Sequence, residues 1–362
     1  MINQSNTKIQ EFFLQLVRLG IGTSKDAHIP KSIDWVQLKA LAEEQGLSAI
    51  VLDAIDKLPT EKRPLQELLL EWIGDVLQNF ELRYSEYKKA IGSLASFYNQ
   101  HGFKMMVLKG YACSLDWPKP EHRPCGDIDI WLFGKQKEAD KAIVKEKGVK
   151  IDNFHHHHTI FNWRDFTVEN HYDFIEVHHH SSSPALEAIL KEKGQDDTHF
   201  VELYGEKVYL PSPNLHALFL LRHNIEHFVA TSITLRQVLD WAFFVQAHGK
   251  DVDWAWLERV MEEFGMRKFY DIINAICVED FGFDINLFTR VQFLPQVKDR
   301  VLHDILTPEF DDKEPKCFLP RVFFKYRRWK ANGWKYELCY KGSRWSAFWS
   351  AAWNHVLKPR SI

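Results

Sequence analysis

This sequence of 362 residues lacks the cysteine patterns that hold secreted domains together or bind zinc through thiolates. Its five cysteines are odd in number and scattered, with no CxxC pair, and lie at positions 113, 125, 277, 317 and 339. Disulfide frameworks and thiolate zinc sites depend on paired, regularly spaced cysteines. We therefore expect free thiols and a reducing, cytoplasmic location.

The sequence also lacks a secretory signal peptide and a run long enough to span a membrane. Near the N-terminus, Lys8, Glu11, Gln15 and Arg18 interrupt the apolar residues, which argues against a signal peptide. No run approaches the roughly 20 apolar residues that cross a bilayer. The formal net charge of -3 provides no overall attraction to nucleic acid or to an anionic membrane. We expect no membrane partner.

What the sequence does contain is typical of a folded protein, with 45% hydrophobic and 26% charged residues on a length that allows two or three domains. Apolar residues follow helical spacing before residue 100 and after residue 213, whereas short apolar runs between them predict strands. We predict an α+β fold with four regions: an N-terminal helical region at 1–101, an α/β core at 102–211, a helical region at 212–310 and a basic, tryptophan-rich tail at 311–362.

Two stretches of the helical regions resemble each other. Residues 33–46 match residues 252–265 at a constant offset, including Asp34 with Asp253 and Gly46 with Gly265. We interpret the match as two helices with the same N-terminal cap, with a chance match as the alternative. A third helix is predicted to begin near residue 64 and to stop before Gly102.

Short elements are predicted in the core from apolar runs and turn residues. We expect strands at 103–108, 127–133, 149–153, 158–163 and 172–180, and helices at 109–116 and 135–147.

The stretch from Asp127 to Ile130 alternates an acid with an apolar residue. A strand sends alternate side chains to opposite faces, so Asp127 and Asp129 would share one face. Adjacent carboxylates repel unless a cation or a shared proton lies between them. Mg²⁺, which prefers oxygen ligands, suits such a pair, and phosphoryl transfer often uses two such ions. Solvent-facing acids are the alternative.

A two-metal site requires a third carboxylate from elsewhere in the chain. Glu176 is our candidate because the stretch 172–180 also alternates, and a strand there would bring Glu176 to the same face as the aspartates. Asp173 would fall on the opposite face of that strand, and we favour Glu169 and Asp173 less.

Several short motifs occur in an order that resembles a known family. They are Leu108 to Gly110, Arg123, Gly126 to Asp129 and Ile175 to His178, followed by His223, His227, Leu235, Arg236, Asp240, Asp253 and Trp254. This chain resembles, over roughly residues 30–285, the uncharacterised nucleotidyltransferase family of the DNA polymerase β-like superfamily. The resemblance implies a mixed sheet with helices on one face and transfer of a nucleoside monophosphate from an NTP to an unknown hydroxyl-type acceptor.

The resemblance also implies roles for individual residues. Asp127 and Asp129 would bind two Mg²⁺ ions, and Glu176 would bind the catalytic ion and help deprotonate the acceptor. The nucleotide-binding residues would be Lys109, Gly110, Arg123, Gly126 and His178. Arg123 has a structural ion pair as its alternative role, and the alternatives for His178 are to contact the metals or to orient Glu176.

The sequence departs from the superfamily at the phosphate-binding turn. Lys109, Gly110 and Tyr111 stand where a Gly-Ser pair is usual, so Lys109 would supply a cation in place of the serine hydroxyl. This departure keeps a second hypothesis open, a catalytically silent nucleotide-binding or interaction protein on the same fold.

Histidine motifs provide further alternatives. His223, Glu226 and His227 form an HxxEH motif, which is typical of a zinc peptidase, although no third ligand is evident. The histidine runs at 155–158 and 178–180 raise the possibility of transition-metal binding. We interpret the first run as a turn that enters a strand and the second as part of the strand that carries Glu176.

The C-terminal tail from Arg321 onward is rich in basic residues and tryptophan. Such a pattern can bind nucleic acid through phosphate contacts and base stacking. We favour the alternative, a helix whose tryptophans pack on the protein body while its charges face water.

Overall fold

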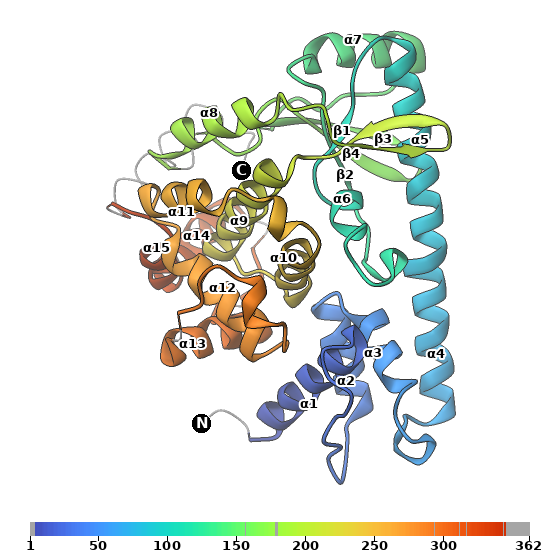
Figure 1. Ribbon diagram of the computed structural model, residues 1–362, viewed down its shortest axis with the longest axis vertical. Helices are drawn as coiled ribbons and strands as arrows, with labels where there is room; N and C mark the ends of the chain where they lie inside the picture. Colours follow the sequence, from blue (N-terminus) through green and yellow to red (C-terminus); the bar gives the residue numbers. More distant parts are fainter. Residues whose placement is uncertain are drawn as a thin grey trace.

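The computed structural model describes residues 4–155, 157–177, 180–292, 294–310, 312–315, 317–342 and 344. Within these ranges, a six-stranded sheet lies among helices that precede and follow it in the chain (Figure 1). The predicted α+β fold is confirmed.

The sheet is mixed, with strand order β3-β4-β2-β1-β6-β5 in the described residues. The hairpin pairs β3/β4 and β5/β6 and the central pair β1/β2 are antiparallel, whereas β2/β4 and β1/β6 are parallel. The strands are β1 (Met106–Val107), β2 (Ile128–Trp131), β3 (His158–Trp163), β4 (Phe166–His171), β5 (Phe200–Leu203) and β6 (Glu206–Tyr209).

The predicted strand at 172–180 is wrong. The strand in this part of the chain is β4, which ends at His171. Beyond it, the backbone N–H groups of Phe174 and Ile175 donate to the Glu187 carboxylate at 3.0 and 3.1 Å instead of joining a strand ladder. Phe174 and Ile175 are both buried, so the apolar residues of this stretch are accounted for without a strand. The predicted strand at 149–153 is reduced to a single bridge between Asp152 and Ile160.

One long helical run connects the N-terminal helices to the sheet (Figure 1). It consists of α4 (Gln66–Val76), a π-helical segment η2 (Leu77–Leu82) and α5 (Arg83–Gln100). The helix predicted to begin near residue 64 and to stop before Gly102 is confirmed. Before it lie α1 (Gln4–Ile21), α2 (Trp35–Glu44), α3 (Ser48–Ile55) and η1 (Thr60–Lys62).

The two matching stretches do form helices with the same cap. Asp34 accepts a hydrogen bond from the backbone N–H of Gln37 at the start of α2, and Asp253 accepts one from Trp256 at the start of α11 (Trp254–Glu263), both at 2.9 Å. Gly46 and Gly265 follow these helices with φ of 67° and 77°. The interpretation of a shared cap is confirmed.

Some helices connect the strands, and others follow the sheet. The connecting helices are α6 (Tyr111–Ser114), η3 (Pro120–His122), α7 (Gln136–Lys147) and α8 (Ser183–Lys193). The later helices are α9 (Pro213–Ala230), α10 (Leu235–His248), η4 (Gly249–Asp251), α11, α12 (Arg267–Glu279), η5 (Ile285–Leu287), α13 (Pro295–Leu306), α14 (Phe318–Ala331) and α15 (Gly333–Cys339).

Buried apolar side chains form two clusters. One joins α1 to α4 with the helices from α9 onward, and the other packs α5 and α7 against the sheet. Gln45 links the two sets of helices, since its Nε2 donates to Ile305 O at 3.0 Å and its Oε1 accepts from Leu235 N at 2.9 Å. The N-terminal helices α1 to α4 and the helices that follow the sheet therefore share one core.

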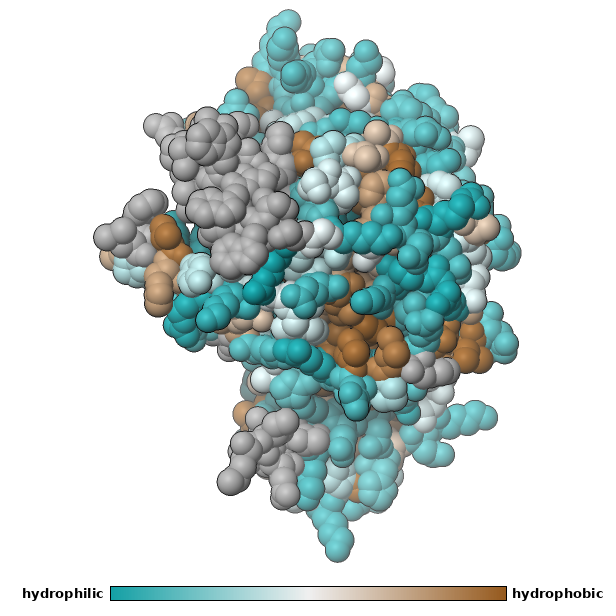
Figure 2. Space-filling model, turned by 90° about the vertical axis from the view of Figure 1, so that its left-hand side faces the viewer, coloured by the Kyte–Doolittle hydropathy of each residue, from teal (hydrophilic) through white to brown (hydrophobic). Residues whose placement is uncertain are grey.

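The surface is largely hydrophilic on the face in Figure 2, where smaller groups of apolar side chains interrupt the polar ones. No helix in the described part of the chain has an apolar stretch long enough to cross a bilayer. In the tail, Trp334 packs on Phe228 with ring centroids 5.7 Å apart, as the packing alternative predicts. The tryptophans at 345, 349 and 353 lie outside the described residues.

Candidate active site

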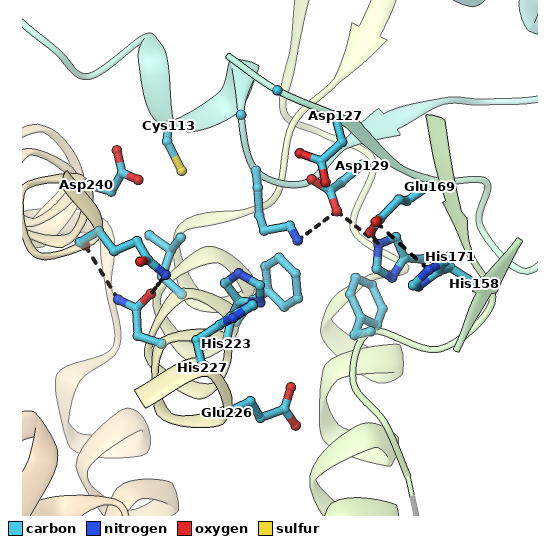
Figure 3. Close-up of a pocket in the computed structure, with 18 of the residues that line it drawn as sticks. Cys113, Asp127, Asp129, His158, Glu169, His171, His223, Glu226, His227 and Asp240 are labelled. Carbon is cyan, nitrogen blue, oxygen red and sulfur yellow. Dashed lines mark hydrogen bonds and ion pairs between the residues drawn. The ribbon is translucent and has the colours of Figure 1, made fainter. Parts of the chain in front are cut away.

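A cavity of about 590 Å³ lies between one side of the sheet and the helices α9 and α10. Acids from β2 and β4 gather on one wall, and side chains of α9 face them across the space (Figure 3). The residues that line it and that the sequence singled out are Lys109, Gly110, Arg123, Gly126, Asp127, Asp129, His157, His158, Glu169, Glu176, His223, Glu226, His227, Arg236 and Asp240.

Three carboxylates come together because β2 and β4 are parallel neighbours. Asp129 on β2 lies opposite Glu169 on β4, and Asp127 precedes β2 by one residue. Residues in register on paired strands point to the same face, as does a residue two positions away. Asp129 is 2% exposed, whereas Asp127 is exposed at the cavity mouth. The alternation of acids thus produces a cluster of oxygen ligands.

Glu169 occupies the place beside the aspartates that was predicted for Glu176. Glu176 lines the same cavity from the segment that follows β4, and it is not in register with β2. A signal for Glu169 was present, since Phe166 to Glu169 alternates apolar with polar residues. The apolar residues Phe174 and Ile175 moved the predicted strand past the actual end of β4 at His171, and this displaced the predicted ligand from Glu169 to Glu176.

Lys109 and His171 surround Asp129 with positive charge. Lys109 Nζ lies 2.7 Å from Asp129 Oδ1, and His171 Nε2 donates to the same oxygen at 3.1 Å. Burial alone would raise the pKa of Asp129, but these two partners outweigh it and hold the pKa well below its usual value. Asp129 is therefore ionised.

Asp127 is in a different electrostatic state. Desolvation raises its pKa, and the negative charge of Asp129 adds to the rise, while Lys109 opposes it. The two aspartates therefore repel, and added positive charge in the cavity stabilises both in their ionised form. Three carboxylates on adjacent strands fit the oxygen-ligand preference of Mg²⁺.

Gly110 forms the turn between β1 and α6, with φ of 49°. A Cβ at this position would lie 2.3 Å from the Oη of Tyr87, which itself donates to the backbone oxygen of Asp127 at 2.7 Å. Glycine is required here by both the backbone conformation and the close approach of Tyr87. Through Tyr87, the turn that follows Lys109 is therefore held against the backbone of Asp127.

Arg123 forms a buried bidentate ion pair with Asp240 of α10. Its Nε and Nη2 donate to the two carboxylate oxygens at 2.8 and 2.9 Å, and Trp117 Nε1 donates to Asp240 Oδ1 at 2.8 Å. Arg123 thus forms the structural ion pair that was its alternative predicted role. Gly126 lines the cavity, and His178 lies outside the described residues.

The HxxEH motif lies on α9, opposite the carboxylates. Glu226 is paired with Arg222 at 2.9 Å, and the His223 and His227 rings contact each other with centroids 4.4 Å apart. Burial lowers the pKa of both histidines. Among the described residues, two groups of side chains bring three ligand atoms within 4.8 Å of one another, and neither group includes a side chain of this motif. The peptidase alternative therefore has no metal cluster to support it in the described chain.

Arg236 of α10 contributes a cation to the cavity. In the described chain its guanidinium has no hydrogen bond or ion pair of its own, unlike that of Arg123. Burial lowers its pKa, and the nearby Arg123 lowers it further, while Asp240 opposes both effects. An anionic group in the cavity would relieve this unfavourable environment.

The comparison with protein-family models agrees with the motifs. The profile of the family described as "Uncharacterised nucleotidyltransferase" matches residues 31–282. Among solved structures, the chain is similar to an antigenic nucleotidyltransferase-like protein from Paracoccidioides brasiliensis, with 16% identity, a TM-score of 0.33, and coverage of 45% of this chain and 77% of that one. A comparison with curated proteins found no match. Because the family match spans more than half of the chain, this protein belongs to the uncharacterised nucleotidyltransferase family.

Proposed function

We propose that the protein transfers a nucleoside monophosphate from an NTP to a hydroxyl-bearing acceptor, with two Mg²⁺ ions held by Asp127, Asp129 and Glu169. The observation that carries the proposal is the register of Asp129 with Glu169 on parallel strands, with Asp127 beside them. Bound Mg²⁺ in such sites neutralises charge on the phosphates and activates the attacking hydroxyl.

The chain's own residues then have distinct tasks. Asp129 is kept ionised by Lys109 and His171, so it is available as an oxygen ligand without first losing a proton. Glu169 is the carboxylate that takes the proton of the acceptor hydroxyl. As the bond from the acceptor oxygen to the α-phosphorus forms, the bond from that phosphorus to pyrophosphate breaks, and pyrophosphate leaves.

The triphosphate is proposed to lie near Lys109, Gly110 and Arg236. The unpaired guanidinium of Arg236 supports this placement, because guanidinium binds phosphate oxygens in a bidentate manner. Arg123 keeps its ion pair with Asp240 and thereby fixes α10, the helix that carries Arg236. Glu176 also lines the cavity but lies outside the strands, so a Glu176 variant serves as the control for a Glu169 variant.

One experiment tests the proposal directly. Calorimetry measures Mg²⁺-dependent binding of NTPs to wild type and to the double variant Asp127→Asn with Asp129→Asn. Binding in wild type and loss of binding in the variant support the proposal, and equal binding in both removes it. Release of pyrophosphate in the presence of small-molecule, sugar, protein or RNA acceptors then shows the acceptor class.

A second candidate is a catalytically silent nucleotide-binding protein on the same fold. It is favoured by Lys109, whose ammonium is paired with Asp129 where the superfamily usually has a serine hydroxyl for the phosphates. Mg²⁺-dependent NTP binding without pyrophosphate release from any of the acceptors supports this candidate, and release with one of them excludes it.

The proposed location is the reducing cytoplasm, which is supported by the absence of a disulfide among the five cysteines. We do not assign a nucleic-acid partner, because Trp334 packs in the protein body and Lys335 is buried against Asp304 at 2.5 Å.

A further inference from the structure

Three histidines gather at one end of the β3/β4 hairpin, beside the carboxylates. His158 begins β3 and is in register with His171 at the end of β4, and His157 precedes β3. The ring centroids lie 4.3 Å apart for His157 and His158, 5.4 Å for His157 and His171, and 5.2 Å for His158 and His171. One nitrogen of each ring lies within 4.8 Å of a nitrogen of each of the others.

Two of these rings have buried nitrogens without a partner. The Nδ1 atoms of His157 and His158 are inaccessible to solvent and have no hydrogen-bond partner in the described chain, and His158 is only 7% exposed. A buried polar atom without a partner costs free energy, and such atoms usually mark an ion, a water molecule or a functional role.

The third ring is already oriented toward the acids. The Nδ1 of His171 donates to the backbone oxygen of Asp173 at 3.2 Å, which directs Nε2 to the opposite side. Such a bond to a carbonyl oxygen is the usual support of a metal-binding histidine. Nε2 lies 3.6 Å from Glu169 Oε2, and His158 Nε2 lies 3.9 Å from Glu169 Oε1. Glu169 therefore places an oxygen ligand against two of the three rings.

We propose that His157, His158 and His171 bind a transition-metal dication of the zinc type, with Glu169 as an additional oxygen ligand. When the metal binds, His171 Nε2 releases to solvent the proton that it donates to Asp129, because a ligating nitrogen must be deprotonated. Imidazole nitrogen suits Zn²⁺ and its neighbours in the periodic table, whereas Mg²⁺ prefers an all-oxygen shell. Three histidines and one carboxylate complete a four-coordinate shell of the kind that Zn²⁺ adopts. The site shares Glu169 with the proposed Mg²⁺ site but differs from it in its three nitrogen ligands, and its metal binding is measured without nucleotide.

Zinc binding to the full chain, without an added histidine tag, tests the proposal. Protein stripped with a chelator is titrated with Zn²⁺ against a chromophoric competitor, and Co²⁺ serves as a second probe because its visible absorption reports coordination geometry. We expect one equivalent per chain in wild type and an affinity at least about tenfold weaker in His158→Asn and in His157→Asn, since each loses a ligand. His199→Asn is the matched control, an exposed histidine outside the cluster.

The outcomes separate this inference from the proposed function. Because His158 is buried, thermal unfolding of each variant checks its fold, and the less buried His157 supplies the second variant. Equal Zn²⁺ affinity in wild type and in a folded His157→Asn or His158→Asn protein overturns the proposal, as does failure of wild type to bind one equivalent. Asp127→Asn, which removes a proposed Mg²⁺ ligand outside the histidine cluster, is expected to keep Zn²⁺ binding whether or not it binds NTP.

Discussion

Asp129 and Glu169 lie opposite each other on the parallel strands β2 and β4, and His171 at the end of β4 donates to Asp129 at 3.1 Å. This register brings carboxylates separated by 40 positions in the sequence to one wall of the cavity. It also distinguishes Glu169 from Glu176, which reaches the cavity from outside the sheet.

The first prediction compares these two glutamates. Glu169→Gln removes the charge of a proposed metal ligand and proton acceptor, so pyrophosphate release is expected to fall by about a hundredfold or more. Glu176→Gln retains the cluster formed with β2 and is expected to have a much smaller effect. Steady-state kinetics of both variants provide the measurement, and a larger loss in Glu176→Gln would reverse the assignment.

The second prediction concerns the turn at Gly110. Gly110→Ala would force a Cβ toward Tyr87 Oη in a backbone conformation that alanine rarely adopts, and we expect a loss of about 1–3 kcal/mol in the free energy of unfolding. In Gly126→Ala the new Cβ has no heavy atom within 4 Å, so its stability is expected to change by about 0.5 kcal/mol or less.

Urea unfolding of both glycine variants measures the difference. Tyr87→Phe removes the hydroxyl that the new Cβ would meet, so the cost of Gly110→Ala is expected to be smaller in the Tyr87→Phe background. The same cost in both backgrounds would show that the contact with Tyr87 is not what requires glycine.

The third prediction separates a structural role of Arg123 from nucleotide binding. Asp240→Ala leaves the buried guanidinium unpaired, and we expect a loss of about 3–5 kcal/mol in the free energy of unfolding. Glu309→Ala is the control, because it breaks the exposed bidentate pair of Arg300 with Glu309 and is expected to cost about 1 kcal/mol or less. Similar losses in the two variants would contradict the structural role.

The fourth prediction concerns the pH dependence of stability. Burial lowers the pKa of His216 on α9 from 6.5 to about 3, so the unfolded chain binds a proton at this residue at a higher pH than the folded chain does. Its contribution to stability is therefore complete above pH 6.5 and is lost as the pH falls from 6.5 toward 3. We expect the free energy of unfolding of wild type to decrease over this range.

A variant and a control identify the source of that decrease. His216→Phe removes the titrating group and is expected to have a shallower dependence between pH 6.5 and pH 4, whereas His199→Asn at an exposed position is expected to retain the wild-type slope. Chemical denaturation at several pH values provides the comparison. An unchanged slope in His216→Phe would show that His216 does not stay neutral in the folded protein.

Local sequence patterns accounted for much of the fold. Helical spacing and caps located α2, the run from α4 to α5, and α11, because those signals depend on neighbours within a few residues. The alternation at Asp127 to Ile130 also located β2, since the period of a strand is visible in its own residues. The prediction of a strand at 172–180 was wrong because the apolar residues beyond His171 belong to a segment whose backbone N–H groups bond to Glu187 and not to a neighbouring strand.

The sequence by itself determined the fold class, the family and the acidic strand, because each depends on residues that are close together or in a fixed order along the chain. The tertiary structure decided which glutamate lies beside Asp129. It also decided that Arg123 pairs with Asp240 and that histidines from the two strands of a hairpin meet beside Glu169. The reason is physical: strand register and helix packing set distances between side chains, and neither is encoded in the spacing of any single segment.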